Sequence, residues 1–320
     1  MAALELSDAH VARLRTWMWL GFCGALLVGL ALVPWVSRNI SFWFYLMLWI
    51  SMASAFNIIS GFAGYLPFGY VAFYGIGAYV TAILVRKLDW PLALAIPLAG
   101  VAGVLLSLIF AKMLKLSGIY FAIVSLALGI ICQILISNLP EEITGGSYGI
   151  NLGGSPEPMH SFYAMLAVLA GTLATSAWVA RSRLGTALKA IRDDGEAADA
   201  LGVNVPRVRL YAWMLAALFP SLCGAVEAWY TNVVDSTTAF DTLVTAKTVI
   251  YATMGGLGTM SGPVVGTAIL VGIDDLIWQH FPVANLFLLG LVVVLLIQFM
   301  PRGIVGTLLR RQPVLRRYLM

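Results

Sequence analysis

The 320-residue chain is 61% hydrophobic and only 11% charged, with a net charge of +4 and a mean hydropathy of +0.92. Soluble domains carry about a quarter of charged residues, so this composition excludes a water-soluble globular protein. Cys23, Cys132 and Cys223 each lie alone in apolar sequence and offer neither a disulfide framework nor zinc-ligand spacing. We predict an all-α integral membrane protein, because a backbone in lipid has to satisfy its own hydrogen bonds.

Ten apolar stretches of about 20 residues, the length that a helix needs to cross a bilayer, follow one another along the chain. The first begins near Trp17, after a segment that carries both Glu5 and Arg15, and no small-residue cleavage site follows it. We therefore expect a retained span instead of a signal peptide. The ten expected spans lie near 17–36, 40–60, 66–85, 91–111, 118–139, 162–180, 210–230, 243–260, 263–279 and 284–300.

The basic residues are unevenly distributed between the two sides of these spans. If the N-terminus is cytoplasmic, 15 of the 19 Lys and Arg residues fall on the cytoplasmic side, and only Arg38, Arg86 and Lys87 fall outside. This asymmetry is the positive-inside bias of membrane proteins, so we predict that both termini are cytoplasmic. Arg86 and Lys87 are a local exception, which a re-entrant or irregular segment at 66–85 would explain.

We expect a single transmembrane domain over residues 1–320, with its membrane-spanning region at 17–300, a cytoplasmic loop at 181–209 and a basic cytoplasmic tail at 301–320. Spans two to five and spans seven to ten begin on opposite sides of the membrane. These two four-helix blocks are compatible with an inverted repeat. The outer segments collect most of the acidic residues, a field that disfavours anionic solutes more than zwitterionic or neutral ones.

The cytoplasmic loop at 181–209 is too polar to be a span, yet its apolar residues recur near helical spacing between Leu184 and Leu201. Gly195 interrupts the pattern, and Gly202 stands where a helix C-terminus favours a residue with positive φ. The pattern predicts a short, broken helix lying flat below the membrane. By itself this pattern is more typical of an amphipathic interfacial helix than of a docking element.

Three segments together resemble one protein family. Glu196-Ala197-Ala198 followed by Gly202 is similar to the coupling motif of ABC importer permeases. Residues 61–79 and 254–266 are similar to the N-terminal and C-terminal glycine-rich signatures of the branched-chain amino acid ABC transporter permease family. The segments occur in the family's order and spacing over about residues 40–305, and the chain is identified as a member of its second permease subunit type.

The resemblance implies a type II ABC importer-like permease fold of about ten transmembrane helices in the bacterial cytoplasmic (inner) membrane. It also implies a heterodimer with a homologous permease subunit, two ATP-binding subunits and a periplasmic solute-binding protein. The chain contains no glycine-rich phosphate loop followed by lysine, so we expect it to bind no cofactor. ATP and Mg are then used by the partner ATPase subunits, and the chain is a transport subunit, not an enzyme.

The same resemblance assigns the contact with the ATPase to the cytoplasmic loop. A helix of small residues can dock closely into a cleft on the ATPase, and charged neighbours can fix the register of the contact. The expected coupling residues are Arg192, Asp193, Asp194, Glu196, Ala197, Ala198 and Gly202.

The translocation path is expected near the two glycine-rich signatures, because glycine tolerates the non-helical backbone found where spans break around a cavity. For any single glycine, plain helix packing is the alternative. The expected path residues are Gly69, Tyr70, Phe73, Tyr74, Gly77, Lys247, Gly255, Gly256 and Gly258. For Lys247, three roles stay open: snorkelling outward, pairing with Asp241 or Glu227, and contact with a substrate carboxylate.

The solute and the transport class have alternatives. Many family members carry a Gln-x-Ser-x-Gly-His run where this chain has Tyr65-Leu66-Pro67-Phe68-Gly69-Tyr70, so urea or short amides stand beside branched-chain or related amino acids. An ion-coupled secondary transporter would need intramembrane acids or histidines, yet all three histidines fall in terminal or loop regions: His10, His160 and His280. We expect the partners to be membrane lipid and the transporter subunits named above. We expect no nucleic-acid partner, because the basic residues form no stripe with aromatics.

Overall fold

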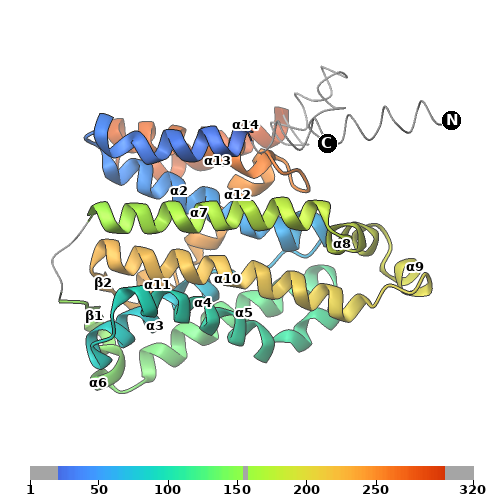
Figure 1. Cartoon of the computed structure of the whole chain (residues 1–320), viewed down its shortest axis with the longest axis horizontal. Coiled ribbons are helices and arrows are strands. Elements are labelled where there is room, and N and C mark those ends of the chain that lie inside the picture. The colour runs from blue at the N-terminus through green and yellow to red at the C-terminus, as the bar shows by residue number, and fades with distance from the viewer. Residues whose placement is uncertain (1–20, 154–157, 300–320) are drawn as a thin grey trace.

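The computed structural model describes residues 21–153 and 158–299, and this part of the chain is almost entirely helical. Its long helices lie side by side in one bundle (Figure 1). Six of them are long and apolar enough to cross a membrane: α2 with the π-helix η1 (Ile40–Phe62), α3 (Val71–Leu88), α4 (Leu92–Ile109), α5 (Gly118–Asn138), α7 (Pro158–Arg181) and α10 (Val205–Thr231). The prediction of an all-α membrane protein is confirmed.

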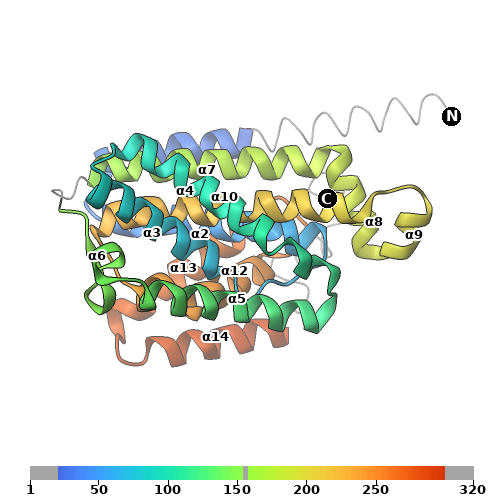
Figure 2. The same ribbon diagram turned by 90° about the horizontal axis from the view of Figure 1, so that it is seen from below.

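Four further helices accompany these six within the described residues. They are Gly21–Val36, α12 (Thr242–Gly255), α13 (Gly262–His280) and α14 (Asn285–Phe299). In Figure 2, α14 lies at an outer edge of the bundle. Each expected apolar stretch therefore contains a helix, but only six helices of the described part of the chain meet the length and hydropathy of a full span. The count of ten spans stays a prediction, and so does the inverted repeat.

The two ends of the bundle carry different structures, which both views separate clearly (Figures 1 and 2). One end carries α8 (Arg183–Asp193) and α9 (Gly195–Ala200). The other carries α6 (Glu141–Thr144), η3 (Gly146–Tyr148) and two short antiparallel strands, β1 (Ile150–Asn151) and β2 (Val233–Val234). These strands connect the loop after α5 to the end of α10, a pairing that no local sequence pattern indicated. The remaining short elements are η2 (Ala111–Lys115) and α11 (Ser236–Ala239).

Close helix packing in the centre depends on small residues. At Gly77 of α3, a side chain would collide with the backbone carbonyl of Ser221 on α10, and at Gly224 of α10 it would collide with that of Tyr74 on α3. In a membrane, small residues let helix backbones approach and gain van der Waals contact where lipid supplies no hydrophobic driving force. The approach of α3 and α10 therefore requires glycine on both helices.

The third expected span differs from the observed helix. Residues 66–70 are not helical, and α3 begins only at Val71 and continues as a regular helix to Leu88. Arg86 and Lys87 lie in its last turn. Arg86 adjoins Gly153, just after β1, so this basic pair lies at the end of the bundle opposite α8. The irregular backbone precedes α3, whereas the basic pair lies in the last turn of the same helix. The irregular segment therefore does not explain why Arg86 and Lys87 are an exception to the positive-inside bias.

Candidate functional site

The broken helix predicted between Leu184 and Leu201 is confirmed as α8 and α9. The break falls at Asp194, whose backbone is extended and whose carboxylate accepts hydrogen bonds from the backbone N–H groups of Glu196 and Ala197, both at 3.0 Å. Asp194 is thus the N-cap of α9. At the other end, Gly202 adopts a φ of 87° and Val203 N donates to Ala198 O at 3.0 Å, which is the closure that a C-terminal glycine permits.

The residues expected to contact an ATPase divide into two groups. Most are exposed at the end of the bundle: Arg192, Asp193, Asp194, Glu196, Ala197 and Gly202. Ala198 is buried and packs with Ile191 and Val205 in a small apolar cluster that holds α8, α9 and α10 together. A larger side chain at Ala198 would therefore disturb the loop itself before it met any partner.

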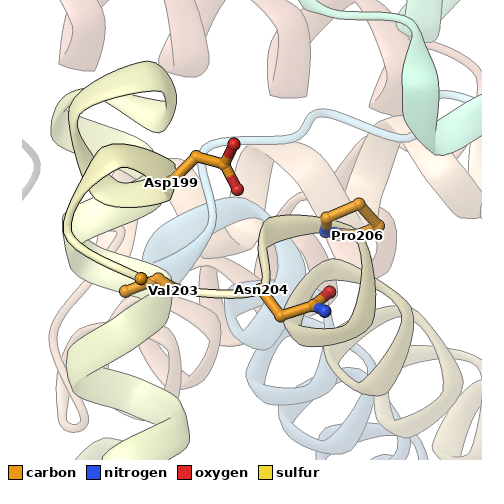
Figure 3. Close-up of a pocket in the computed structure, with 5 residues that line it drawn as sticks. Asp199, Val203, Asn204 and Pro206 are labelled. Atoms are coloured by element: carbon orange, nitrogen blue, oxygen red, sulfur yellow. The ribbon is translucent and has the colours of Figure 1, made fainter.

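A shallow pocket opens on this exposed end, between α9 and the start of α10 (Figure 3). Asp199 lies on one side of the pocket, Asn204 and Pro206 lie on the other, and Val203 lies in the turn between them. The Asn204 side chain accepts a hydrogen bond from Arg207 N at 3.2 Å and caps α10, so the rim of the pocket is anchored. The Asp199 carboxylate thus lies in the pocket beside the turn that contains Val203.

Three cations of α8 and α10 reach inward onto one short segment. Arg192 Nη1 donates to Gly61 O at 2.8 Å. Lys189 Nζ lies 5.7 Å from the ring centroid of Phe62, and the Arg209 guanidinium lies 5.0 Å from that of Tyr65. All three contacts fall within residues 61–65, at the beginning of the first glycine-rich signature. The membrane helix ends in this segment as a π-helix, and non-helical backbone follows. π-helical turns are frequent at functional sites.

The second glycine-rich signature meets the first at the same place. Asn57 Nδ2 donates to Thr259 O at 2.9 Å, and Gly258 N donates to Asn57 Oδ1 at 2.8 Å. Asn57 is only 2% exposed, so both ends of its amide are satisfied in the interior. We call the five residues that meet here, Asn57, Gly61, Arg192, Gly258 and Thr259, the signature junction.

Sequence reasoning missed Asn57, although a signal was present. A polar amide stands in a largely apolar span, four residues before the first signature glycine. A buried amide within a span requires hydrogen-bond partners. The irregular backbone of both signatures was expected and is confirmed, since Gly64, Gly256 and Gly258 all have positive φ.

The expected path residues of α3 and the segment before it lie inside the bundle. Tyr70 OH donates to Ala216 O at 2.6 Å, and the ring of Phe73 packs edge-on against Trp213 with centroids 5.0 Å apart. Tyr74 is also buried, and a side chain at Gly69 would collide with the backbone of Ser125, as one at Gly77 would with Ser221. Helix packing accounts for these five positions. That they also line a path stays a prediction.

Lys247 is paired, but with neither of the two acids expected. Its Nζ lies 2.8 Å from Asp274 Oδ2 on α13 and 5.9 Å from the ring centroid of Trp49. Asp274 also accepts hydrogen bonds from Tyr251 OH at 3.3 Å and from Asn285 Nδ2 at 2.9 Å. Asp241 instead caps the start of α12. The expectation of Asp241 or Glu227 was wrong, because α13 packs against α12 and brings a distant acid to Lys247.

Comparison with known proteins finds one family. The family described as "Branched-chain amino acid transport system / permease component" matches residues 39–297, a range that contains both signatures and the coupling loop. The high-affinity branched-chain amino acid transport system permease protein LivM of Salmonella typhimurium is 29% identical over 293 residues, covering 81% of this chain and 68% of that protein. LivM of Escherichia coli shows the same values. The permease protein LivH of Escherichia coli is 25% identical over 285 residues, covering 80% of this chain and 90% of LivH.

Proposed function

Because this chain belongs to the branched-chain amino acid transport system permease family, we propose that it is the translocation subunit of an ATP-driven ABC importer for branched-chain or related amino acids. Its family makes it a transport component and not an enzyme, and its six long apolar helices make it a multi-pass membrane protein. The source of energy, the direction of transport and the exact solute belong to the proposal.

The observation that carries the proposal is the coupling loop. It folds as two capped helices at one end of the bundle, exposes Glu196 and Ala197, and sends Arg192 inward to Gly61 at the end of a membrane helix. An exposed helix that also contacts the ends of spans can pass the movement of a partner into the membrane domain.

The proposed assembly contains this permease, a homologous permease, two ATP-binding subunits and a periplasmic solute-binding protein in the bacterial inner membrane. Two kinds of permease protein from one named transport system, LivM and LivH, both resemble this chain, which supports a heterodimer of homologous permeases. We propose ten spans with both termini cytoplasmic. In this orientation the end that carries α8 and α9 faces the cytoplasm and the ATPases, which are expected to use ATP and Mg.

Reconstitution tests this proposal directly. The chain is purified together with its proposed partner permease and two ATP-binding subunits and placed in liposomes with the solute-binding protein and labelled leucine. We expect uptake that requires ATP and survives collapse of the proton gradient. Uptake by the chain alone, driven by a proton gradient, would overturn the proposal. Calorimetry on the binding protein with leucine, urea and short amides identifies the solute class.

A further inference from the structure

We propose that Arg192 is the positioning residue that transmits movement of α8 to both glycine-rich signatures, because it binds Gly61 and passes beside Gly258 at the signature junction. The inference rests on the proposed function, since it needs an ATPase that moves α8. It gives Arg192 a role different from that of its exposed neighbours on the coupling loop. They face a partner, whereas its guanidinium faces the membrane domain.

The Arg192 guanidinium binds both the exposed Asp193 carboxylate and the Gly61 carbonyl of the membrane domain. Its Nε and Nη2 donate to Asp193 Oδ1 at 3.4 and 3.3 Å, and its Nη1 donates to Gly61 O at 2.8 Å. The side chain of Asp193 is 73% exposed and that of Arg192 is 40% exposed. The guanidinium is planar, and its N–H donors are held in a fixed fork. A displacement of one edge of the group therefore displaces the other edge as well. A force on Asp193 therefore reaches the Gly61 carbonyl through two side chains.

The Gly61 carbonyl lies in the last turn of a membrane helix. It belongs to η1 (Ile58–Phe62), the last turn of the 23-residue span that begins at Ile40. Carbonyls in the last turn of a helix lack intrahelical partners and carry the negative end of the helix dipole. A cation that binds there can hold or displace the whole span.

The glycines of both signatures make room for this arginine. Gly64 has a φ of 79°, and a side chain there would begin 2.9 Å from Arg192 Cγ. Gly258 has a φ of 80°, and a side chain there would begin 2.9 Å from Arg192 Nη1 and 3.1 Å from Gly61 O. Gly64 and Gly258, which are 194 residues apart, thus both lie against the Arg192 side chain. This contact supplies a physical reason for glycine in both signatures.

Movement of Arg192 would act on two parts of the bundle. Gly61 ends the span of α2, whereas Gly258 and Thr259 form the turn between α12 and α13. Asn57 binds Gly258 and Thr259 through its amide, so the two parts are linked by directional hydrogen bonds. Lys189 and Arg209 contact only aromatic rings in this segment, and such contacts tolerate sliding. Arg192 is therefore the residue whose loss should separate ATP hydrolysis from transport.

The test compares Arg192→Met, Arg192→Lys and the control Lys87→Met in the full reconstituted complex. Lys87 is exposed in the last turn of α3, at the end of the bundle opposite α8 and outside the signature junction. Coupling between sites typically amounts to about 5- to 150-fold, so we expect Arg192→Met to raise the ATP hydrolysed per leucine imported by at least about fivefold. Arg192→Lys should recover part of the loss, because an ammonium can still donate to Gly61 O. Lys87→Met should match the wild type.

Hydrogen exchange separates transmission from mere stability. In the wild-type complex, trapping the ATPases with nucleotide and vanadate should change exchange in peptides covering 183–193, 57–64 and 255–262. In Arg192→Met the change at 183–193 should remain, and the changes at 57–64 and 255–262 should be lost. Equal responses in both proteins, or loss of ATPase binding by Arg192→Met, would overturn the inference. A wild-type complex without ATP-dependent uptake would instead overturn the proposed function.

Discussion

The ion pair of Lys247 and Asp274 places two opposite charges between the helices α12 and α13. Their side chains are 24% and 16% exposed, and Tyr251, Asn285 and the ring of Trp49 surround them. Charges inside a membrane domain persist where they are paired and hydrogen-bonded. With these partners, Lys247 has a structural function before any contact with solute is considered.

Lys247→Met should therefore destabilise the protein, because it leaves the Asp274 carboxylate half-buried without its cation. Loss of a hydrogen bond to a charged group costs about 1.5–3 kcal/mol, so the melting temperature of the purified complex should fall. Lys247→Met combined with Asp274→Asn should restore most of the stability. If uptake recovers together with stability, Lys247 acts through the pair. Stable protein with uptake still lost would show that Lys247 contacts the substrate carboxylate.

Among the elements, the coupling loop is built so that its exposed and buried faces are distinct. Ala197 and Glu196 point outward, while Ala198 belongs to the apolar cluster with Ile191 and Val205. Two adjacent alanines in one motif thus lie in different environments, one exposed and one buried. The ATPase contact is therefore best probed at Ala197, because Ala198 also supports the loop, and a side chain at Gly202 would strain its positive φ.

Ala197→Trp should block close docking of α9 on the ATPase without unfolding the loop. We expect the stimulation of ATP hydrolysis by loaded binding protein and the uptake of solute to fall together, and insertion into the membrane to stay normal. Glu196→Lys should act in the same direction by reversing a charge at the contact. Ala93→Trp is the matched control, because Ala93 is exposed at the start of α4, at the end of the bundle opposite α8. Wild-type values in Ala197→Trp would contradict the docking role.

At the opposite end, α11 depends on its acidic N-cap. The Asp235 carboxylate accepts hydrogen bonds from the backbone N–H groups of Thr237 and Thr238, both at 2.9 Å, and from their hydroxyls. Partial burial raises the pKa of Asp235, but these hydrogen bonds outweigh it and hold the pKa below its usual value. A lowered pKa in the folded state means that the cap stabilises the protein above the unfolded pKa and stops doing so as the pH falls.

Asp235→Asn should consequently destabilise the protein most near neutral pH. Asparagine is itself a good N-cap residue, so this variant mainly removes the charge. A hydrogen bond to a charged group contributes about 1 kcal/mol more than a neutral one, and the usual pKa of Asp is about 3.9. The difference in melting temperature between wild type and variant should thus be constant above about pH 5 and shrink below about pH 4. Parallel curves down to acid pH would show that the charge of Asp235 does not contribute.

For the whole molecule, the two unlike ends of the bundle specify an orientation that can be measured. Ala190 is exposed on α8, and Tyr148, in the loop after α5, is 90% exposed at the other end. The three native cysteines are buried, so they should react little with external reagents. Single cysteines introduced at these two positions therefore report on opposite sides of the membrane.

In intact cells, an impermeant maleimide should label Tyr148→Cys and leave Ala190→Cys unlabelled until the membrane is opened. A tag after Met320, which lies outside the described residues, should be cytoplasmic. Labelling of Ala190→Cys from outside would reverse the orientation. It would also remove the coupling loop from the side where ATP is available.

The sequence by itself determined the membrane class, the positions of the apolar helices, the broken helix at 183–200 and the family. These features depend on local composition and spacing: 20-residue apolar runs, the helical recurrence from Leu184 to Leu201, and a glycine that closes α9. Only the tertiary structure decided which distant groups meet. Lys247 and Asp274 are 27 residues apart, and Asn57 and Gly258 are 201 apart. Helix packing sets such contacts, and no pattern along the chain encodes which faces of two helices turn toward each other.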